Sequence, residues 1–434
     1  MRVAILGGGM AGVYTARKLH ERGYEVTVFE AGPRVGGLCR SDVVDGFVYD
    51  VAGGHILHSR DPEILAEMVG VLEEPLAHAR QTKIYYRGRY VKYPFENGLS
   101  DLPAEDNYQC LKGYLDAYIG RREGASEPTN FHDWIVWRFG EGMARHFMLP
   151  YNQKIWSVDL REVSTDWVRG RVPEAPLEDV LRAALGITTE GYTHQLNFYY
   201  PRRGGFEAIV AGFARGLEPR IRLSTPVRQV LRAGGRTQVN GESFDQVVNT
   251  LPLGILLDVL EPRPPEDVRD ALAGLRHLSL TTVLVAVDRP QLSPYSWVYL
   301  PHEDNGRHNR ITFLSNYSPW NAPPGKSSVL SEITSPGGSG PPDLAETERH
   351  VVEALERTGM LKADWVMFTR SFFNEYAYPV YDLGFKKNIS RVLAYLDEIE
   401  LLSLGRFARY RYVNTDQVVA MVREALATSF PPLV

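Results

Sequence analysis

Residues 2–31, RVAILGGGMAGVYTARKLHERGYEVTVFEA, decide the fold of this chain. The apolar run at 2–6 predicts a buried strand, and the apolar periodicity of 11–22 predicts an amphipathic helix. A second apolar run at 24–29 predicts another strand. A strand, a helix and a strand in this order are typical of a parallel Rossmann-like sheet, so we expect an α/β fold.

Three glycines stand at the turn between the first strand and the helix. Gly7, Gly9 and Gly12 have G-x-G-x-x-G spacing, which lets a backbone approach a pyrophosphate at the N-terminus of a helix. Glu30 ends the second strand and can accept hydrogen bonds from ribose hydroxyls. The pattern predicts a dinucleotide site, and the alternative is a tight strand–helix turn that binds nothing.

Composition limits the other classes of function. The chain has 434 residues, enough for two or three domains, and a net charge of −5, which argues against a nucleic-acid partner. Apolar runs such as 280–287 are far shorter than the roughly 20 residues of a membrane span, so we expect no membrane partner. Cys39 and Cys110 supply neither a disulfide framework nor metal-ligand spacing. We therefore expect no metal.

The location of the protein follows from the same features. The first predicted strand starts at residue 2, so we expect no targeting segment before it. With only two cysteines in the sequence, a reducing cytoplasm is the expected compartment.

A second glycine pair indicates which dinucleotide is bound. The stretches AGPRVGGLCRS (31–41) and GFVYDVAGGHILHS (46–59) follow the acidic residue, and together they resemble the glutathione-reductase-like FAD superfamily. The resemblance implies FAD rather than NAD. The implied cofactor-binding residues are Gly7, Gly9, Met10, Ala11, Gly12, Glu30, Ala31, Gly37, Leu38, His55, Val227, Gly405, Arg406, Asn414, Thr415 and Gln417.

Later segments fit a discontinuous FAD domain. Residues 220–253 alternate as short strands, and a helix is predicted to start near Asn414–Thr415, where Asn or Thr is a good N-cap. We expect an FAD-binding domain of residues 1–90, 195–254 and 366–434, with a helical insertion at 91–194 and an antiparallel β-sheet domain at 255–365.

Eight blocks spread over most of the chain carry a closer resemblance, to the UDP-galactopyranose mutase family. They are YDVAGGHILHS (49–59), GRYVKYPFENGLSDLP (88–103), FMLPYNQKIWSV (147–158), WVRGRVPEAP (167–176), YPRRGG (200–205), NRITFLSNYSPWN (309–321), YAYPVYDLGF (376–385) and LGRFARYRYVNTDQV (404–418). The resemblance implies an isomerase that interconverts pyranose and furanose forms of a nucleotide sugar, with N5 of reduced FAD as the nucleophile. An external reductant such as NAD(P)H is compatible with it, and the oligomeric state stays open.

The resemblance also implies site residues. His55 would lie beside the flavin, and Arg171 and Arg310 would hold the diphosphate, since guanidinium groups bind phosphate bidentately. These three are the predicted catalytic residues. The predicted substrate-binding residues are Tyr93, Glu96, Asn152, Trp156, Tyr317, Tyr378 and Tyr410.

Two of these assignments leave alternatives open. Asn152 and Trp156 could instead be a helix cap and a core tryptophan. Tyr412 stands two residues after Tyr410 in the same block and is the other candidate for that position.

One residue departs from the family pattern. Glu96 stands where eukaryotic-type mutases carry Gln. An ionised carboxylate accepts hydrogen bonds and donates none, so it suits a base edge with donors better than a uracil carbonyl. The base and the sugar are therefore left open.

Two other functions share parts of the pattern. An amine-oxidase or protoporphyrinogen-oxidase-like FAD oxidoreductase would share the N-terminal third and the C-terminal block, but would not need an arginine pair facing a diphosphate. A binding protein like the Rab dissociation inhibitors would not need the intact set of Gly7, Gly9, Gly12 and Glu30.

Overall fold

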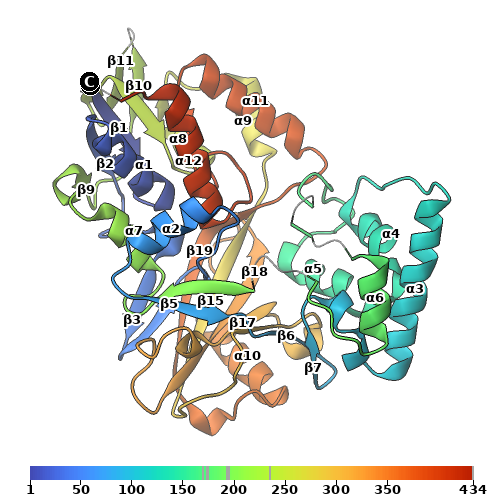
Figure 1. Cartoon of the computed structure of the whole chain (residues 1–434). Helices are drawn as coiled ribbons and strands as arrows, with labels where there is room; N and C mark the ends of the chain where they lie inside the picture. The colour runs from blue at the N-terminus through green and yellow to red at the C-terminus, as the bar shows by residue number, and fades with distance from the viewer. Residues whose placement is uncertain (169–170, 173–174, 192–195, 234–235, 433–434) are drawn as a thin grey trace.

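The computed structural model describes the chain except residues 169–170, 173–174, 192–195, 234–235 and 433–434. The N-terminal segment forms the centre of a parallel sheet with the strand order β20-β13-β1-β2-β9, of which Figure 1 labels β1, β2 and β9. Its strands are β1 (Arg2–Leu6), β2 (Glu25–Phe29), β9 (Ile221–Arg222), β13 (Gln246–Asn249) and β20 (Leu402–Ser403). The predicted α/β fold with a Rossmann-like sheet is confirmed.

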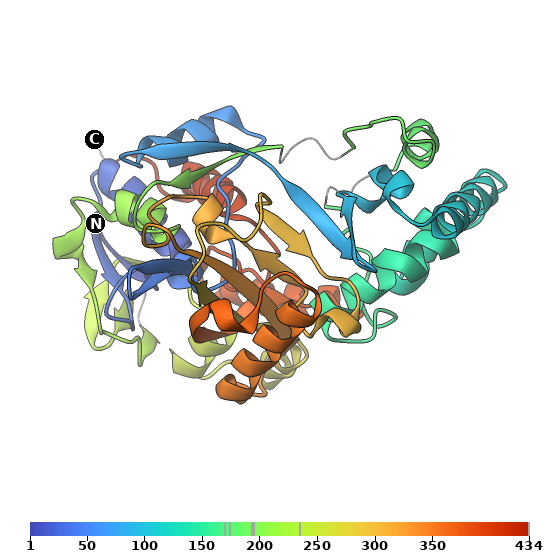
Figure 2. The same ribbon diagram turned by 90° about the horizontal axis from the view of Figure 1, so that it is seen from below.

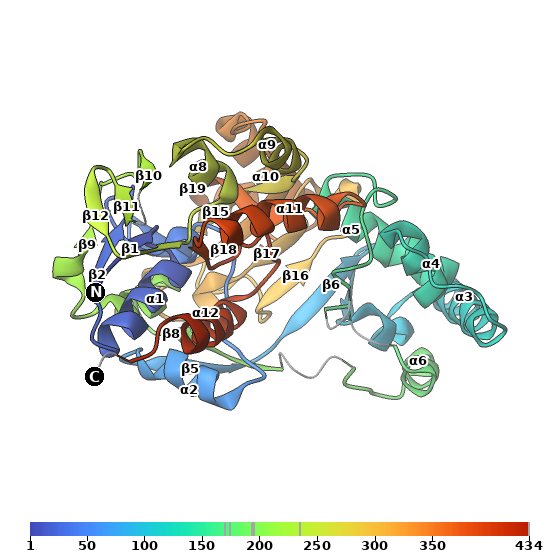
Figure 3. The same ribbon diagram turned by 90° about the horizontal axis from the view of Figure 1, so that it is seen from above.

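Helices α1 and α12 pack against each other beside this sheet (Figure 3). α1 packs against α7 and α12, and α12 also contacts α2 (Figure 3). Their shared core contains Val13, Val419 and Val422, which are fully buried. The bounds are α1 (Met10–Glu21), α2 (Pro62–Gly70), α7 (Glu207–Ala214) and α12 (Thr415–Ser429).

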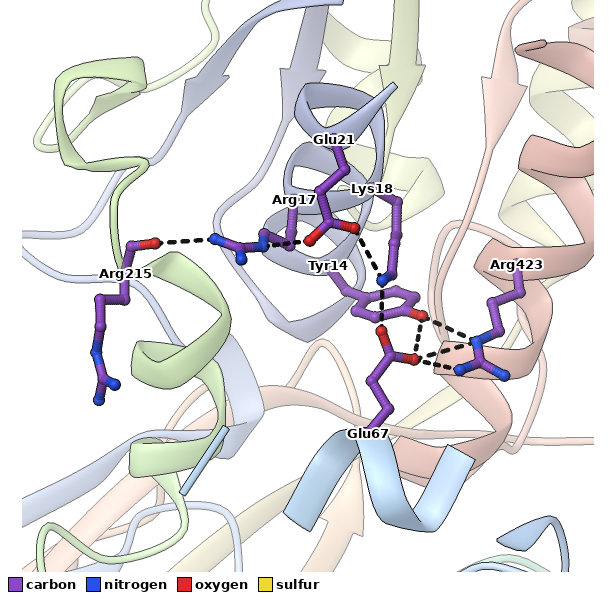
Figure 4. Close-up of polar contacts among 7 residues, drawn as sticks. All are labelled: Tyr14, Arg17, Lys18, Glu21, Glu67, Arg215 and Arg423. Carbon is purple, nitrogen blue, oxygen red and sulfur yellow. Dashed lines mark hydrogen bonds and ion pairs between the residues drawn. The ribbon is translucent and has the colours of Figure 1, made fainter. Parts of the chain in front are cut away.

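A polar cluster fixes these helices to one another (Figure 4). Glu67 of α2 accepts a hydrogen bond from the hydroxyl of Tyr14 at 2.8 Å and pairs with Lys18 at 2.5 Å, both on α1. Arg423 of α12 donates to the same carboxylate at 3.1 Å. One half-buried carboxylate thus joins three helices, which holds the N-termini of α1 and α12 in a fixed relation.

The antiparallel sheet is larger than the sequence predicts. Its seven strands have the order β19-β15-β18-β17-β16-β6-β7, and all neighbours are antiparallel except β16 and β6. They are β6 (Thr82–Tyr86), β7 (Arg89–Lys92), β15 (His277–Val287), β16 (Trp297–Tyr299), β17 (Arg310–Thr312), β18 (Ser327–Pro336) and β19 (Val366–Pro379).

The expected domain boundaries at 90 and 366 therefore cut this sheet. β6 belongs to the segment 1–90 and β19 to the segment 366–434, yet backbone pairing places both in the sheet that 255–365 was expected to form alone. Strand pairing joins segments that are far apart in sequence, so local alternation could not reveal these partners.

The helical insertion lies to one side of both sheets, as the three views show (Figures 1–3). Its core contains Phe139, Met143 and Trp156, and its helices are α3 (Ala104–Arg122), α4 (Phe131–Met143), α5 (Leu149–Trp156) and α6 (Leu177–Ala184). A π-helical turn at Ala144–Met148 joins α4 to α5.

Smaller elements complete the described part of the chain. A four-stranded sheet has the order β12-β11-β10-β14, and two strand pairs, β3 with β4 and β5 with β8, lie beside the main sheets. These strands are β3 (Ser41–Val44), β4 (Phe47–Asp50), β5 (Pro75–Ala79), β8 (Asn197–Pro201), β10 (Val230–Ala233), β11 (Arg236–Val239), β12 (Glu242–Phe244) and β14 (Leu260–Glu261). The remaining helices are α8 (Leu253–Val259), α9 (Glu266–Ala273), α10 (Leu344–Arg357) and α11 (Phe385–Glu398).

No helix among the described residues combines the length and the apolar character that a membrane crossing requires.

Candidate functional site

Two adjoining cavities lie where the parallel sheet, the antiparallel sheet and the helical insertion meet. The larger, of about 670 Å³, is lined by the glycine turn Gly7–Gly9, and we call it the glycine cavity. The smaller, of about 510 Å³, is lined by the rings of Phe95, Phe147 and Tyr151 among others, and we call it the aromatic cavity. The walls that they share contain His58, Tyr299, Arg310, Tyr412 and Asn414.

The N-terminus of α1 opens into the glycine cavity. Gly9 precedes the helix without any side-chain cap, and Met10 and Ala11 of the first turn line the same wall. The first N–H groups of a helix have no intrahelical partner and carry the positive end of its dipole. This wall therefore offers backbone donors to an anionic group.

The two glycine segments approach each other closely, and Gly37 leaves little room for a side chain. Gly37 has φ +55°, and a Cβ built on it would lie 3.1 Å from the Cα of Gly9. Glu30 holds the turn from the other side, because its carboxylate accepts hydrogen bonds from the N–H groups of Gly8 and Gly32, both at 2.7 Å. Glu30 thus lines the cavity as expected and also fixes the shape of the glycine turn.

The C-terminal block forms the opposite wall. Asn414 and Thr415 stand at the start of α12, where the N–H of Asn414 donates to Oε1 of Gln417 at 3.0 Å. Gly405, with φ +114°, passes so close to α1 that a Cβ would lie 3.0 Å from the Cβ of Ala11. Arg406 also lines the cavity, while its guanidinium donates to backbone carbonyls. A second helix N-terminus therefore faces the same space as α1.

His55 and Leu38 lie on the wall between these two sides. The imidazole of His55 stacks on Phe206, with ring centroids 4.9 Å apart. Burial, followed by the positive charges of Arg406 and Arg310, lowers the pKa of His55 to about 3. The imidazole is therefore neutral at physiological pH.

Four predicted cofactor residues lie outside the glycine cavity's wall. Gly12 lies behind the turn, where a Cβ would be 1.9 Å from the carbonyl oxygen of Gly7, so this glycine serves helix–strand packing. Ala31 is exposed, and Val227 packs against the core around Leu253. Gln417 lines the aromatic cavity instead, because the capping geometry turns it away from the glycine turn.

Helix α5 forms one wall of the aromatic cavity. Asn152 lines it and donates to the carbonyl of Met148 at 2.8 Å, and Trp156 lines it while packing on Trp167 at 4.8 Å between ring centroids. Trp156 is only 2% exposed, so it is both a wall and a core residue. Lys154 binds elsewhere, since its ammonium donates to three backbone carbonyls of the 300–306 loop.

Both predicted arginines lie in the aromatic cavity. Arg310 donates from Nε and Nη2 to the carboxylate of Glu332, each at 2.8 Å, and this buried pair stands directly across β17 and β18. Arg171 lies with its guanidinium carbon 4.1 Å from the ring centroid of Tyr412 and donates to Gln417 at 3.3 Å. Arg171 forms no ion pair with any described carboxylate, and burial lowers its pKa.

The predicted tyrosines divide into wall and core residues. Tyr93 lines the aromatic cavity and Tyr378 lines the glycine cavity. Tyr317 and Tyr410 line neither cavity. Tyr317 is 1% exposed among the rings of Phe198 and Tyr200, and Tyr410 is 3% exposed against Phe407.

The position expected for Tyr410 is taken by Tyr412, which lines both cavities. The reason is the backbone: Tyr410 has φ +47°, and this left-handed residue redirects the chain so that the second tyrosine of the block reaches the wall.

Sequence reasoning missed several wall residues. Phe147 and Tyr151 stack on each other at an interplanar angle of 11°, and their four-residue spacing across the start of α5 is the signal that could have identified them. Tyr299 lines both cavities and stands across from Arg310 in the sheet, and Glu332 pairs with that arginine. Both neighbours of Arg310 follow from the register of the paired strands, which the sequence alone does not reveal.

The glycine cavity fits a dinucleotide. It combines the N-terminus of α1, which has no side-chain cap, the N-terminus of α12, a closely approaching pair of glycine segments and a carboxylate at the end of β2. No cluster of three or more His, Cys, Asp or Glu in the described ranges is arranged to hold a metal ion. The chemistry of the donors matches a diphosphate and a ribose.

Known proteins share this architecture. A solved structure described as "Crystal structure of reduced UDP-Galactopyranose mutase" superposes with a TM-score of 0.90 at 26% identity, covering 99% of this chain and 96% of that one. Protoporphyrinogen oxidase 2 of Arabidopsis thaliana is 40% identical over 163 residues, which are 35% of this chain and 31% of that protein. The "Probable UDP-galactopyranose mutase" of Klebsiella pneumoniae is 26% identical over 166 residues, 37% of this chain and 42% of that one.

These sequence matches are partial, since this chain covers less than two thirds of the length of either curated relative. The structural likeness, by contrast, extends over the whole chain, which confirms the resemblance to UDP-galactopyranose mutase at the level of the fold. The family model described as "Flavin containing amine oxidoreductase" matches residues 10–381. With far more than half of its residues matched, the chain belongs to the flavin containing amine oxidoreductase family, and its cofactor is FAD.

Proposed function

We propose that this protein is an FAD-dependent isomerase that interconverts the pyranose and furanose forms of a nucleotide sugar. The observation that carries the proposal is Arg171. Its guanidinium is half-buried beside Tyr412, burial lowers its pKa, and it makes no ion pair within the described residues. A desolvated cation without a counter-charge is costly, so this position favours an anionic ligand such as a diphosphate.

Arg310 provides a second guanidinium group, on the wall that the two cavities share. Its Nε and Nη2 are bound to Glu332, and Nη2 also donates to the carbonyl of Gly54 at 3.2 Å. Its Nη1 makes no hydrogen bond to a described residue, so this nitrogen can reach an oxygen in the cavity. We expect Arg310 to hold the phosphate next to the sugar and Arg171 to hold the other phosphate.

The two arginines have a role in the reaction as well as in binding. When the bond between the sugar and the diphosphate breaks, negative charge builds up on the leaving oxygen. Guanidinium groups that are already in position stabilise that charge without any reorganisation. Tyr412, stacked under Arg171, keeps this guanidinium in place.

The residues of the glycine cavity would hold FAD, which in its reduced form would provide a nucleophilic nitrogen for the anomeric carbon. The chain's contribution there is electrostatic. The N-terminus of α12, with Asn414 and Thr415 on the cavity wall, favours negative charge on the cofactor. His55, neutral because of its lowered pKa, adds no charge there, and its Nδ1, unpartnered among the described residues, can exchange a hydrogen bond with a bound ring.

The second candidate is an oxidoreductase of amines or porphyrinogens, and the family match and the 40% identity to protoporphyrinogen oxidase 2 favour it. An amine substrate would enter as a cation. The aromatic cavity would then place it near Arg171, whose charge no described carboxylate neutralises. This repulsion favours the isomerase over an amine oxidase.

The experiment that tests the proposal compares the two redox states of the purified holoenzyme. Dithionite-reduced and oxidised protein are incubated without oxygen with hexopyranose sugars of UDP, GDP, CDP and ADP, and the furanose products are separated by liquid chromatography. We expect many turnovers by the reduced protein without stoichiometric consumption of reductant, and none by the oxidised protein. Product formation that requires the oxidised state and consumes oxygen in proportion would establish the oxidoreductase instead.

A further inference from the structure

Glu96 is a buried acid without a partner on the wall of the aromatic cavity. It lies in a 3-10 turn at Phe95–Asn97, and its side chain is 2% exposed. Neither of its carboxylate oxygens has a hydrogen-bond partner among the described residues. Buried carboxylates normally accept hydrogen bonds. Asp50, a fully buried acid in the core, accepts them from Ser41, Tyr200 and the N–H of Phe206.

Aromatic side chains line the same cavity as this acid. Phe95 stacks on Phe147 at 4.9 Å with an interplanar angle of 15°, and Phe147 stacks on Tyr151 at 5.1 Å. All three rings line the same cavity as Glu96. Aromatic faces next to a hydrogen-bonding group are the means by which proteins read the edge of an unpaired nucleobase. The carboxylate and the rings therefore suit a base rather than a sugar or a phosphate.

The two carboxylate oxygens of Glu96 determine which nucleobase edge is complementary to it. Two adjacent carboxylate oxygens accept two parallel N–H groups. Guanine offers such a pair, N1–H beside the N2 amino group, whereas uracil offers one N–H between two carbonyls. Adenine and cytosine each offer an amino group beside a ring nitrogen acceptor. Only guanine gives both oxygens of an ionised Glu96 a donor, and such charge-assisted bidentate bonds are the strong ones.

We propose that the aromatic cavity selects a guanine base through Glu96, so that the substrate is a sugar nucleotide of GDP. This inference rests on the proposed function, from which it takes the diphosphate and the sugar. The glutamate belongs to the aromatic cavity alone, while Arg310 lies on the wall shared with the glycine cavity. A guanosine diphosphate sugar would thus have its base at Glu96, its phosphates at the arginines and its sugar toward the flavin.

The protonation state of Glu96 determines whether guanine or uracil is the complementary base. Burial raises the pKa of this carboxyl to about 7, while its own backbone and Arg138 act in the opposite direction; the charge of Glu96 in turn helps to raise the pKa of Tyr93. Guanine requires the ionised form and so releases a proton on binding. A protonated Glu96 would present one donor and one acceptor, as an amide does, and would suit uracil; uracil would then bind with retention of the proton.

The test measures the affinity of the FAD holoenzyme for GDP, UDP, CDP and ADP by isothermal titration calorimetry at pH 6, 7 and 8. We expect GDP to bind tightest, by about tenfold to a hundredfold over UDP, as for one bidentate base contact. Its affinity should rise by up to about tenfold per pH unit below pH 7, with proton release seen as a dependence on the buffer's ionisation enthalpy.

Two variants complete the experiment. Glu96→Gln keeps the shape and removes the charge, so the preference for GDP should fall by about tenfold or more, with UDP gaining. Glu105→Gln removes the same charge from an exposed position on α3 and should leave the ranking unchanged. Glu96→Gln removes a buried acid without a partner, so we expect this variant to fold.

The outcomes separate the two proposals. Preference for UDP, affinity that falls as pH rises, or an unchanged ranking in Glu96→Gln would overturn the guanine assignment and leave the mutase proposal standing. If none of the four nucleotides binds, the nucleotide-sugar mutase itself is overturned, and the guanine assignment with it.

Discussion

Replacing Glu96 by glutamine has a consequence for stability that needs no ligand. Burial raises the pKa of the carboxyl in the folded protein from an ordinary 4.5 to about 7. A rise of this size corresponds to roughly 3 kcal/mol at about 1.4 kcal/mol for each pH unit. The folded protein binds this proton more tightly than the unfolded chain, so stability falls as pH rises from 4.5 to 7 and levels off above 7.

Glu96→Gln cannot ionise and escapes this loss. At pH 8 the variant should be more stable than the unaltered protein by up to about 3 kcal/mol, and at pH 5 by less than about 1 kcal/mol. For a chain of this length each kcal/mol is worth roughly 1 °C in melting temperature, which gives a shift of about 3 °C.

Thermal unfolding followed by circular dichroism, with FAD in excess and without nucleotide, measures this difference. Burial also raises the pKa of Asp50, to about 6. Both proteins contain this acid, so its contribution to stability cancels in the difference between them. A stability difference that is the same at pH 5 and pH 8, or a variant less stable at pH 8, would show that Glu96 is compensated in the folded state.

Three further predictions concern binding. Gly9→Val should give folded protein without the yellow flavin absorbance, because the side chain enters the space of the pyrophosphate, while Gly70→Ala in α2, where a Cβ contacts nothing within 4 Å, should keep it. Arg171→Ala should weaken nucleoside diphosphate binding by about 2–5 kcal/mol in calorimetry with the flavin spectrum unchanged, and equal affinity would exclude the phosphate role. Tyr412→Ala should also weaken this binding, whereas Tyr410→Phe should not; the reverse result would restore Tyr410 to the site.

The cofactor half of the molecule was predictable because its signals are local. Strand, turn and helix periods, the glycine spacing and the acidic residue at 30 all lie within thirty residues, and the structure places β1, α1 and β2 within a residue or two of the predicted bounds. The start of α12 at Thr415 followed from an N-cap residue in the same way.

The substrate half depends on contacts that sequence order hides. Arg310 faces Glu332 only because β17 pairs with β18 in one particular register, and a shift by one residue would separate them. Tyr412 reaches the wall only because Tyr410 adopts a left-handed backbone. The resemblance to a family identified the blocks that contain these residues, but tertiary structure decides which side chain of each block lines a cavity.

The two arginines differ in their charge environment, which would let the cavity both bind and release the diphosphate of the proposed substrate. Arg310 is neutralised by Glu332, which is 3% exposed, so it contributes directed hydrogen bonds and little net charge. Arg171 has no described carboxylate partner and contributes the charge. If both were unpaired, two half-buried cations would repel each other in the unliganded protein and hold the product too tightly. We therefore expect Glu332→Gln to tighten nucleoside diphosphate binding and to slow product release, measurable as a lower dissociation rate in stopped-flow titrations of flavin fluorescence; faster release would show that Glu332 does not moderate the charge of Arg310.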